Sequence, residues 1–272
     1  MKFRCRMNDV AAMRDFTNIV NTVSRMSKRC VMRLTPDVLC FNVGDEHLPV
    51  VWAEICQLRF FHEYEITGSS EELNEIYLEL DTVMLARSVA SLKQNAKSAK
   101  IKLANKKHPC LTIEIELPSL SMDSRQCVHD VPVQVIPRRE WNEYRAPRIP
   151  EFDISLEMPQ LKHVRNMVER MKNMSSNLTL ETDRDGKLIL KVENDCARIA
   201  TYFPNLKVWC RSNLEEDISA SVDIKKFHTF LSWEIIHPDS VKCNILHERT
   251  VNLHLCSEGY LTIHYFMPAI AS

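Results

Sequence analysis

The chain repeats one order of elements twice, and this repeat constrains its fold more than any other feature. Each copy is expected to have a strand, an amphipathic helix and a strand pair, then a strand that opens a second helix and two further strands. The first copy has these elements at 1–7, 10–28, 30–43, 76–81, 82–97, 100–105 and 110–117. The second has them at 152–158, 160–173, 178–192, 218–223, 224–233, 241–246 and 251–256. The offset is about 140 to 150 residues, far above the period of a solenoid, so a whole domain is duplicated.

The bulk composition is that of an ordinary globular protein, with 45% hydrophobic and 26% charged residues in a chain of 272. Half of such a chain is long enough to bury a core. The chain has only four glycines and has neither a G-x-G-x-x-G nor a G-x-x-x-x-G-K-S/T motif. Glycine lets the backbone approach a phosphate in these motifs, so the sequence argues against a nucleotide-binding enzyme.

The ten cysteines include no C-x-x-C pair, and the N-terminal segment has no apolar signal region. No apolar run of about 18 residues suggests a membrane helix. These features predict a reducing compartment, cytosol or nucleus. Cys243, His247, Cys256 and His264 have partly metal-like spacing but no knuckle glycine, so we expect strand residues and no metal or cofactor.

The sequence also offers no favoured catalytic group. No cysteine stands out as a nucleophile. Glu114 and Glu116 alternate along one expected strand, which is typical of solvated carboxylates rather than an acid/base pair.

Most expected strands alternate apolar and polar residues, which indicates antiparallel sheets with one covered face. Residues 136–150 carry three prolines and six charged side chains, so they predict an extended, exposed connector. Trp141 and Tyr144 within it either dock on the surface beneath or pack locally. The expected domains are therefore 1–135 and 151–272, and 204–217 is expected to be a surface loop.

Positive charge is concentrated on the four expected helices. Segments 11–29, 82–100, 160–173 and 224–233 carry a net charge of +12, which leaves −13 on the other 210 residues. Apolar stripes on these helices face the core, and small polar residues such as Asn18 lie between the charges. The simple alternative is that each helix has an ordinary solvated face. Four helices with the same sign favour a surface for a polyanion, and no base-reading motif is present, so phosphate groups would be bound without sequence preference.

Several blocks carry a family resemblance over the whole chain: NEIYLELD from Asn74, KIKLANKKHPCLTIEIEL from Lys100, HDVPVQVIPRREW from His129, VERMKN from Val168 and YFMPAIAS from Tyr265. They resemble the Hus-one family, which supplies one subunit of the nine-one-one DNA-damage checkpoint clamp. The resemblance implies an α+β sliding-clamp fold, similar to DNA clamps and processivity factors. Two duplicated domains would place antiparallel sheets outside and helices on the inner face.

The resemblance also implies a function without catalysis. The chain would form a heterotrimeric ring with two homologous subunits, of the Rad-nine and Rad-one types. A clamp loader would close this ring around double-stranded DNA at damage, and the ring would recruit checkpoint and repair proteins. The implied location is the nucleus, with the cytoplasm as a second compartment.

Three sets of residues follow from the resemblance. The DNA channel would use Arg14, Arg25, Lys28, Arg87, Lys93, Lys97, Lys162, Arg165, Arg170, Lys172, Lys225 and Lys226. The edges that join subunits would use Cys127, His129, Val131, Val133, Val135, Ala197, Ile199, Thr201 and Phe203. A partner-peptide groove beneath the connector would use Cys40, Val43, Ile136, Trp141, Tyr265, Met267 and Pro268. The segments near 44–49 and 204–217 are short for the family.

Two other functions remain open at this point. One is a homotrimeric replication processivity clamp. The other is a protein-interaction scaffold whose basic helices bind acidic proteins. A cysteine hydrolase is a distant further alternative.

Overall fold

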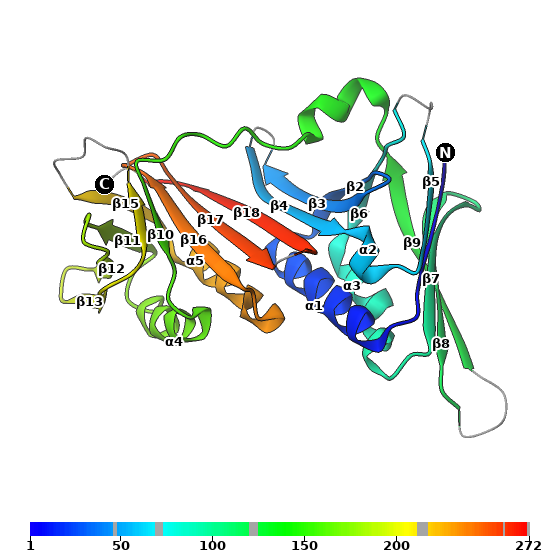
Figure 1. Ribbon diagram of the computed structural model, residues 1–272, viewed down its shortest axis with the longest axis horizontal. Helices are drawn as coiled ribbons and strands as arrows, with labels where there is room; N and C mark the ends of the chain where they lie inside the picture. The colour runs from blue at the N-terminus through cyan, green and yellow to red at the C-terminus, as the bar shows by residue number, and fades with distance from the viewer. Residues whose placement is uncertain (46–47, 69–72, 120–124, 211–216, 258, 271–272) are drawn as a thin grey trace. The chain divides into compact units, whose positions relative to one another are not determined.

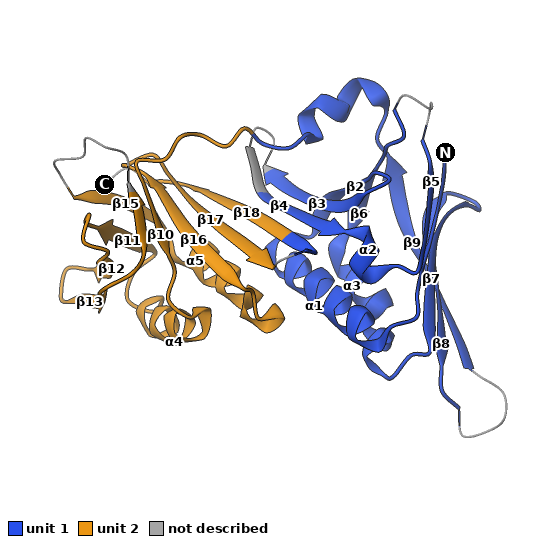
Figure 2. Ribbon diagram, in the orientation of Figure 1, with its two compact units in different colours: residues 1–147, 259–261 blue, residues 148–258, 262–272 orange. Residues whose placement is uncertain are grey.

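The computed structural model describes residues 1–45, 48–68, 73–119, 125–210, 217–257 and 259–270. The chain divides into two compact units, coloured separately in Figure 2. Unit 1 comprises residues 1–147 and 259–261, and unit 2 comprises 148–258 and 262–272. The division after Pro147 falls inside the segment expected to be a connector.

Unit 1 pairs its strands in the order β5-β1-β7-β8-β9-β6-β2-β3-β4, with neighbours antiparallel. Its strands are β1 (Lys2–Met7), β2 (Arg29–Leu34), β3 (Val38–Asp45), β4 (Leu48–Cys56), β5 (Glu63–Thr67), β6 (Ile76–Asp81), β7 (Ser98–Asn105), β8 (Pro109–Leu117) and β9 (Arg125–Val135). Its helices are α1 (Val10–Met26), α2 (Gln57–Phe60), α3 (Thr82–Val89) and the 3-10 turns η1 (Ala90–Lys93) and η2 (Arg138–Tyr144). In Figure 1, α1 and α3 lie side by side against these strands.

Unit 2 repeats this order of elements. Its strands are β10 (Ile154–Glu157), β11 (Asn177–Thr182), β12 (Leu188–Glu193), β13 (Arg198–Phe203), β14 (Val208–Cys210), β15 (Ile218–Asp223), β16 (Ser240–Leu246), β17 (Thr250–Ser257) and β18 (Leu261–Pro268). Its helices are α4 (Leu161–Met171), α5 (Ile224–Phe230) and the 3-10 helix η3 (Leu231–Ile236). The strand orders β14-β10-β16-β17-β18 and β13-β12-β11-β15 match β5-β1-β7-β8-β9 and β4-β3-β2-β6 of unit 1. The predicted duplication and α+β class are confirmed.

The core of each unit lies between the helices and one face of the strands, because the strands alternate buried and exposed side chains. In β15 this alternation is strict, and in α1 the buried stripe includes Phe16, Ile19 and Val20. In unit 2, Phe230 of α5 packs on Tyr265 of β18 with ring centroids 5.4 Å apart. The helices therefore present their opposite, polar faces away from the sheets.

Both second helices are shorter than predicted. We expected continuous helices over 82–97 and 224–233, but α3 and α5 each pass into a 3-10 turn. The turns end at Asn95 (φ 56°) and His237 (φ 49°), in left-handed conformations that cannot continue a helix. The same ending in both copies shows that the duplication extends to the helix ends.

The segment 136–150 is not uniformly extended as predicted, since it contains η2. Trp141 of η2 is buried and stacks on Tyr77 of β6, with ring centroids 4.7 Å apart, and its indole N–H donates to the Ile136 carbonyl at 2.9 Å. Val31 of β2 belongs to the same apolar cluster. Trp141 therefore docks on the strands beneath, and partly buried Tyr144 packs beside it.

The predicted loop 204–217 contains a strand. The three-residue strand β14 pairs with β10, and residues 211–216 lie outside the described part of the chain. The sequence also did not predict strands β4, β5 and β18. The segment near 44–49 is only partly described, since residues 46–47 are not.

Candidate nucleic-acid interface

Three of the four basic helices begin at an aspartate that fixes their first turn. Asp9, Asp81 and Asp223 accept hydrogen bonds from backbone N–H groups of Ala12, Met84 and Lys226 at 2.8–2.9 Å. A carboxylate at the N-terminus of a helix accepts hydrogen bonds from its free backbone N–H groups and interacts favourably with the positive end of the helix dipole. At these three helices the capping carboxylate therefore lies at the N-terminal end, ahead of the lysines and arginines.

In unit 1 the predicted channel residues are exposed. Arg25, Lys28, Arg87 and Lys93 take part in no ion pair within the described residues. Arg14 lies 3.6 Å from the neighbouring Asp15, and Lys97 lies 4.0 Å from Glu116. The end of α1 is tied to the start of α3, because Thr82 donates its N–H to the Lys28 carbonyl at 3.0 Å and its hydroxyl to the Ser27 carbonyl.

In unit 2 the predicted channel residues divide into two groups. Lys162, Arg170, Lys225 and Lys226 are exposed and are in no ion pair within the described chain. Arg165 and Lys172 are only half-exposed. Arg165 Nη1 lies 2.6 Å from Oε1 of Glu234, and Lys172 Nζ lies 2.6 Å from Oε1 of Glu169. Both cations of this second group therefore already face a carboxylate, and their assignment to the DNA channel stays a prediction.

Glu169 has a second partner, His228 of α5, whose Nε2 lies 2.6 Å from its other oxygen. Burial lowers the pKa of His228 despite this carboxylate, and Lys172 and Arg165 act in the same direction. The hydrogen bond from Lys172 lowers the pKa of Glu169. Glu169 is therefore an anion that links α4 to α5, and with Glu234 it takes up part of the positive charge of this unit.

One predicted phosphate-facing residue is misplaced. Asn18 is only 8% exposed, because α1 is buried on more than one side: Thr17 and Thr22 are also buried and donate to the carbonyls of Met13 and Asn18. Thr17 also reaches the Val89 carbonyl of α3 at 3.4 Å. The polar face of α1 is narrower than a helical wheel suggests because α3 covers part of it.

The predicted edge at Ala197–Phe203 is open on one side. Strand β13 is the last strand in its sheet and pairs with β12 alone among the described strands. Ile199 and Tyr202 are large apolar side chains on it that are 40% and 58% exposed. An open strand with exposed apolar residues is a template for a further strand.

The second predicted edge is open over only part of its length. Strand β9 pairs with β8 from Arg125 to Pro132 and with β6 from Val133 to Val135. Val133 and Val135 are therefore not at a free edge, which corrects their assignment, while Cys127, His129 and Val131 lie in the open stretch. Val131 is fully buried on the core side.

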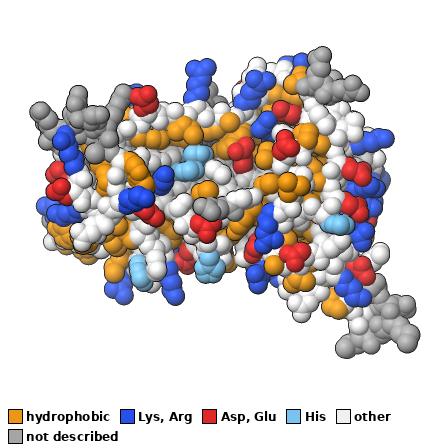
Figure 3. Space-filling model, in the orientation of Figure 1, with side chains coloured by type: hydrophobic (Ala, Val, Ile, Leu, Met, Phe, Trp, Pro, Cys, Tyr) orange, Lys and Arg blue, Asp and Glu red, His pale blue; other side chains and the backbone are white. Residues whose placement is uncertain are grey.

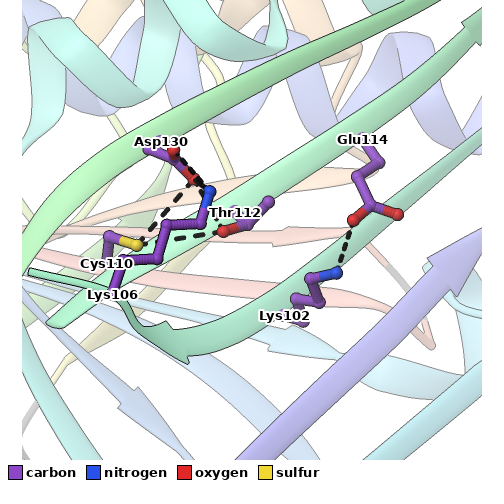
Figure 4. Close-up of polar contacts among 6 residues, drawn as sticks. All are labelled: Lys102, Lys106, Cys110, Thr112, Glu114 and Asp130. Carbon is purple, nitrogen blue, oxygen red and sulfur yellow. Dashed lines mark hydrogen bonds and ion pairs between the residues drawn. The ribbon is translucent and has the colours of Figure 1, made fainter.

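A polar cluster fixes the open end of β9 (Figure 4). Asp130 accepts hydrogen bonds from Lys106 at 2.7 and 2.8 Å and from Thr112 at 2.7 Å, and the Cys110 thiol lies 3.8 Å away. These contacts lower the pKa of Asp130, with Lys106 the main cause. Lys102 pairs with Glu114 on the same hairpin, so Glu114 is ion-paired rather than simply solvated.

The predicted peptide-groove residues do not form one exposed set. Cys40, Val43, Tyr265 and Met267 are all buried, so their side chains cannot line an open groove, and only Pro268 of these strand residues is exposed. Ile136 and Trp141 belong to the cluster with Tyr77 and Val31. Ile136 and Trp141 are buried as well, so the assignment to peptide contact is corrected for all six buried residues.

The described part of the chain shows no site of reactive thiol or metal chemistry. Burial raises the pKa of Cys5, Cys30 and Cys40, and that of Cys243 to about 12, which is the reverse of an activated nucleophile. Cys243 faces the core, whereas His264 stacks on His254 on the other face of the sheet. Within the described residues no three metal-ligating side chains converge.

The face drawn in Figure 3 mixes both signs of charge, with lysine and arginine interspersed among aspartate and glutamate. None of the described helices has the length and hydropathy needed to span a bilayer.

Comparison with known proteins assigns this arrangement to a family. Residues 1–271 match the family model described as Hus1-like protein. The chain belongs to the Hus1-like family. It is 37% identical to the human protein named Checkpoint protein HUS1, over the whole of both chains, and 29% identical to Checkpoint protein Hus1-like of Drosophila melanogaster, over 99% of both.

Solved structures establish the fold of this Hus1-like chain. Proliferating Cellular Nuclear Antigen from Entamoeba histolytica superposes with a TM-score of 0.73 at 12% identity, over 98% of this chain and 99% of that one. PCNA from Thermococcus kodakaraensis gives 0.70 at 13% identity, with the same coverage. The fold is that of a sliding clamp, as predicted.

Proposed function

We propose that this chain is a non-catalytic subunit of a DNA-encircling checkpoint clamp that acts at sites of DNA damage. The observation that supports this most is a set of eight exposed cations in the helices or directly after α1 that have no carboxylate partner in the described chain: Arg25, Lys28, Arg87, Lys93, Lys162, Arg170, Lys225 and Lys226. They occur on equivalent helices of a duplicated clamp unit. Membership of the Hus1-like family supports the checkpoint role.

Such a surface suits a ring that encircles DNA and stays able to slide and rotate on it. Threading retains the ring, so each phosphate contact can be weak and can exchange as the duplex turns. Every phosphate neutralised adds about −0.9 to the slope of log affinity against log salt. Binding to linear DNA with free ends is then weak at physiological salt, whereas a closed ring on circular DNA remains threaded.

The two open edges are the proposed contacts with the neighbouring subunits. Directly after β9, Ile136 donates its backbone N–H to the Tyr77 carbonyl of β6. The side of β9 that faces β6 here is the same side that is open along residues 125–131. Alternate residues of a strand direct their backbone groups to the same side, so Gln126, Val128 and Asp130 offer N–H groups there. Pro132 has no N–H and marks the end of the pairing stretch. A partner strand would therefore pair with residues 125–131, held straight by the Lys106–Asp130 pair.

The ring in this proposal is heterotrimeric, completed by two homologous subunits of the Rad-nine and Rad-one types. A loader opens it, its partners are checkpoint and repair proteins, and it works in the nucleus. Light scattering on the purified chain measures its mass in solution and so tests the composition of the ring. A monomer supports a heterotrimeric ring, because the chain then needs other subunits to close it. A stable homotrimer would instead favour a replication clamp.

The central experiment measures retention on DNA. A ring assembled with the Arg87→Glu/Lys93→Glu chain is bound at low salt to linear duplex DNA with free ends, where threading cannot retain it, then washed with rising salt and compared with the parent ring. We expect a loss of at least tenfold in retained ring, since two phosphate contacts become repulsions. The matched control is Lys2→Glu/Lys107→Glu, which makes the same charge change at exposed residues away from the helices.

Equal retention of the helix variant and the parent would refute the channel. The chain would instead be favoured as a protein-interaction scaffold if it binds acidic proteins and excess duplex DNA does not displace them.

A further inference from the structure

Unit 2 carries a row of planar side chains on the sheet face that points away from its helices. The outermost strand β14 contributes Trp209, and the inner strands β17 and β18 contribute His254, His264 and Phe266. The residues that alternate with these on β17 and β18, such as Leu255 and Tyr265, are buried in the core. Since Tyr265 packs on α5, the row lies on the opposite face from the helix cations.

Trp209 is unusual among the four tryptophans of the chain. It is 40% exposed, whereas Trp52, Trp141 and Trp233 are buried. Two ammonium groups approach its ring: Lys207 Nζ at 5.0 Å and Lys242 Nζ at 4.5 Å from the centroid. Lys207 precedes β14 and Lys242 comes from β16, so two separate elements direct positive charge to one exposed indole.

The row continues across the sheet from Lys242. Lys242 faces His254 in the register of β16 and β17, and His254 stacks on His264 with centroids 4.3 Å apart and planes 7° apart. Phe266 follows, its ring 6.1 Å from that of His264. Burial lowers the pKa of both histidines, that of His264 to about 4, so at neutral pH these rings are uncharged. The row therefore combines neutral planar rings with two lysines at one end.

We propose that this face binds single-stranded nucleic acid, with a base stacked at Trp209 and phosphates at Lys207 and Lys242. Exposed aromatic rings on a sheet, flanked by cations, recognise unpaired bases because every base has a planar face. The row crosses four strand spacings of about 4.8 Å, or ~19 Å, which suits a short stretch of single strand. A duplex hides its base faces, so it cannot use the rings. The proposal does not rest on the proposed channel, because the two surfaces lie on opposite faces of unit 2.

One carboxylate opposes this site. Glu157 of β10 faces Lys242 across the strand pair and reduces the positive potential there. Glu157→Gln is therefore expected to strengthen oligonucleotide binding. An acidic ligand held only by charge would lose affinity when Lys207 and Lys242 are substituted but not when Trp209 is.

The test uses the purified chain and a thymidine oligonucleotide of about twelve nucleotides. Because Trp209 is the one exposed tryptophan, stacking on it should quench part of the intrinsic fluorescence of the parent chain. Anisotropy of a labelled oligonucleotide measures the affinity of every chain, including the variants that lack this indole. Trp209→Ala should weaken binding about 5- to 100-fold, the range expected for the loss of one stacked base. Lys207→Gln/Lys242→Gln should reduce the log–log salt slope by about 1.4, for two contacts to a single strand. Trp209→Phe keeps a ring and should retain most of the affinity.

Three results would overturn the proposal. The first is unchanged oligonucleotide affinity in Trp209→Ala, with a circular dichroism spectrum like that of the parent. The second is equal quenching by a blunt duplex, which cannot stack. The third is equal binding of polyglutamate, which would identify an acidic-peptide surface. Lys2→Gln/Lys107→Gln, at two exposed lysines of unit 1 outside the helices, is the matched control and should leave the quenching unchanged.

Discussion

The helix faces of the two units share one design but use their cations differently. In unit 1, Arg25, Lys28, Arg87 and Lys93 have no carboxylate partner in the described chain, and apolar burial with threonine hydrogen bonds holds α1 to α3. In unit 2, Arg165 of α4 is paired with Glu234 of η3, whereas Lys172 is paired with Glu169 of α4 itself. The Arg165–Glu234 pair and the contact of Glu169 with His228 of α5 join α4 to its neighbours. The longer α1 buries nine residues and the shorter α4 buries four. Where less apolar surface is buried, charge helps to hold the helix in place.

The outer sheet faces differ as well. In unit 1 the hairpin β7–β8 and strand β9 carry ion pairs, Lys102 with Glu114 and Lys106 with Asp130. In unit 2 the equivalent strands carry His254, His264 and Phe266, with Lys242 beside them. In both units the buried positions of these strands thus stay mostly apolar, while the exposed positions differ in residue type. Core packing constrains only the buried side of each strand.

The largest expected difference between the units is in how much their cations contribute to the salt dependence of duplex DNA affinity. Arg87→Gln/Lys93→Gln should reduce the slope of log affinity for duplex DNA against log salt by about 1.8, which is roughly tenfold in affinity between 50 and 200 mM salt. Arg165→Gln/Lys172→Gln should change the slope by less than about 0.5, because these cations already face carboxylates. Fluorescence anisotropy on the assembled ring measures both. Equal slopes would show that the pairs in unit 2 open when DNA binds.

The second difference is in stability. Arg165→Ala leaves Glu234 half-buried and unpaired, so we expect a loss of about 1–2 kcal/mol in the free energy of unfolding. Arg87→Ala removes an exposed side chain and should cost no more than about 0.5 kcal/mol. Urea unfolding of the lone chain compares them. If adding Glu234→Gln to Arg165→Ala restores no stability, the pair does not couple α4 to η3.

A third prediction concerns the rings of unit 2. The folded state lowers the pKa of His264 from 6.5 to about 4, so the unfolded chain binds more protons between these values. Stability should therefore be full above pH 6.5 and fall as the pH drops towards 4. After allowance for partial solvation this amounts to about 1 kcal/mol. His264→Phe should flatten the profile in this window. Thr262→Val, an adjacent change on the same face, should leave it intact.

The sequence predicted the elements that rest on local periodicity. Apolar stripes located α1 and α4, and alternation located β15 and β17, because these patterns are set by which side of one element is buried. It also identified ten of the twelve proposed channel cations as exposed.

The errors came from partners distant in the chain. Glu234 lies 69 residues from Arg165, and Thr17 of α1 reaches the Val89 carbonyl of α3 72 residues away, so no local pattern reveals either contact. Trp141 docks on Tyr77, 64 positions away. Strand β14 has only three residues, too few to show alternation, and it depends on pairing with β10. The Lys172–Glu169 pair was recognisable in principle, since residues three apart on a helix are neighbours.

The smallest predicted effect tests whether Glu169 limits the contribution of unit 2 to DNA binding. Glu169→Gln removes the charge that holds Lys172 and faces His228, so Lys172 becomes available to a phosphate. One added contact should steepen the salt slope by up to about 0.9 and raise duplex affinity about two- to threefold at moderate salt. Anisotropy with the assembled ring measures this, and Glu181→Gln, which releases Lys191 on the strands of the same unit, is the matched control. If both variants raise affinity equally, the gain reflects net charge alone. A gain confined to Glu169→Gln would mean that the two units differ in DNA contact because one carboxylate in unit 2 occupies a cation that unit 1 leaves free.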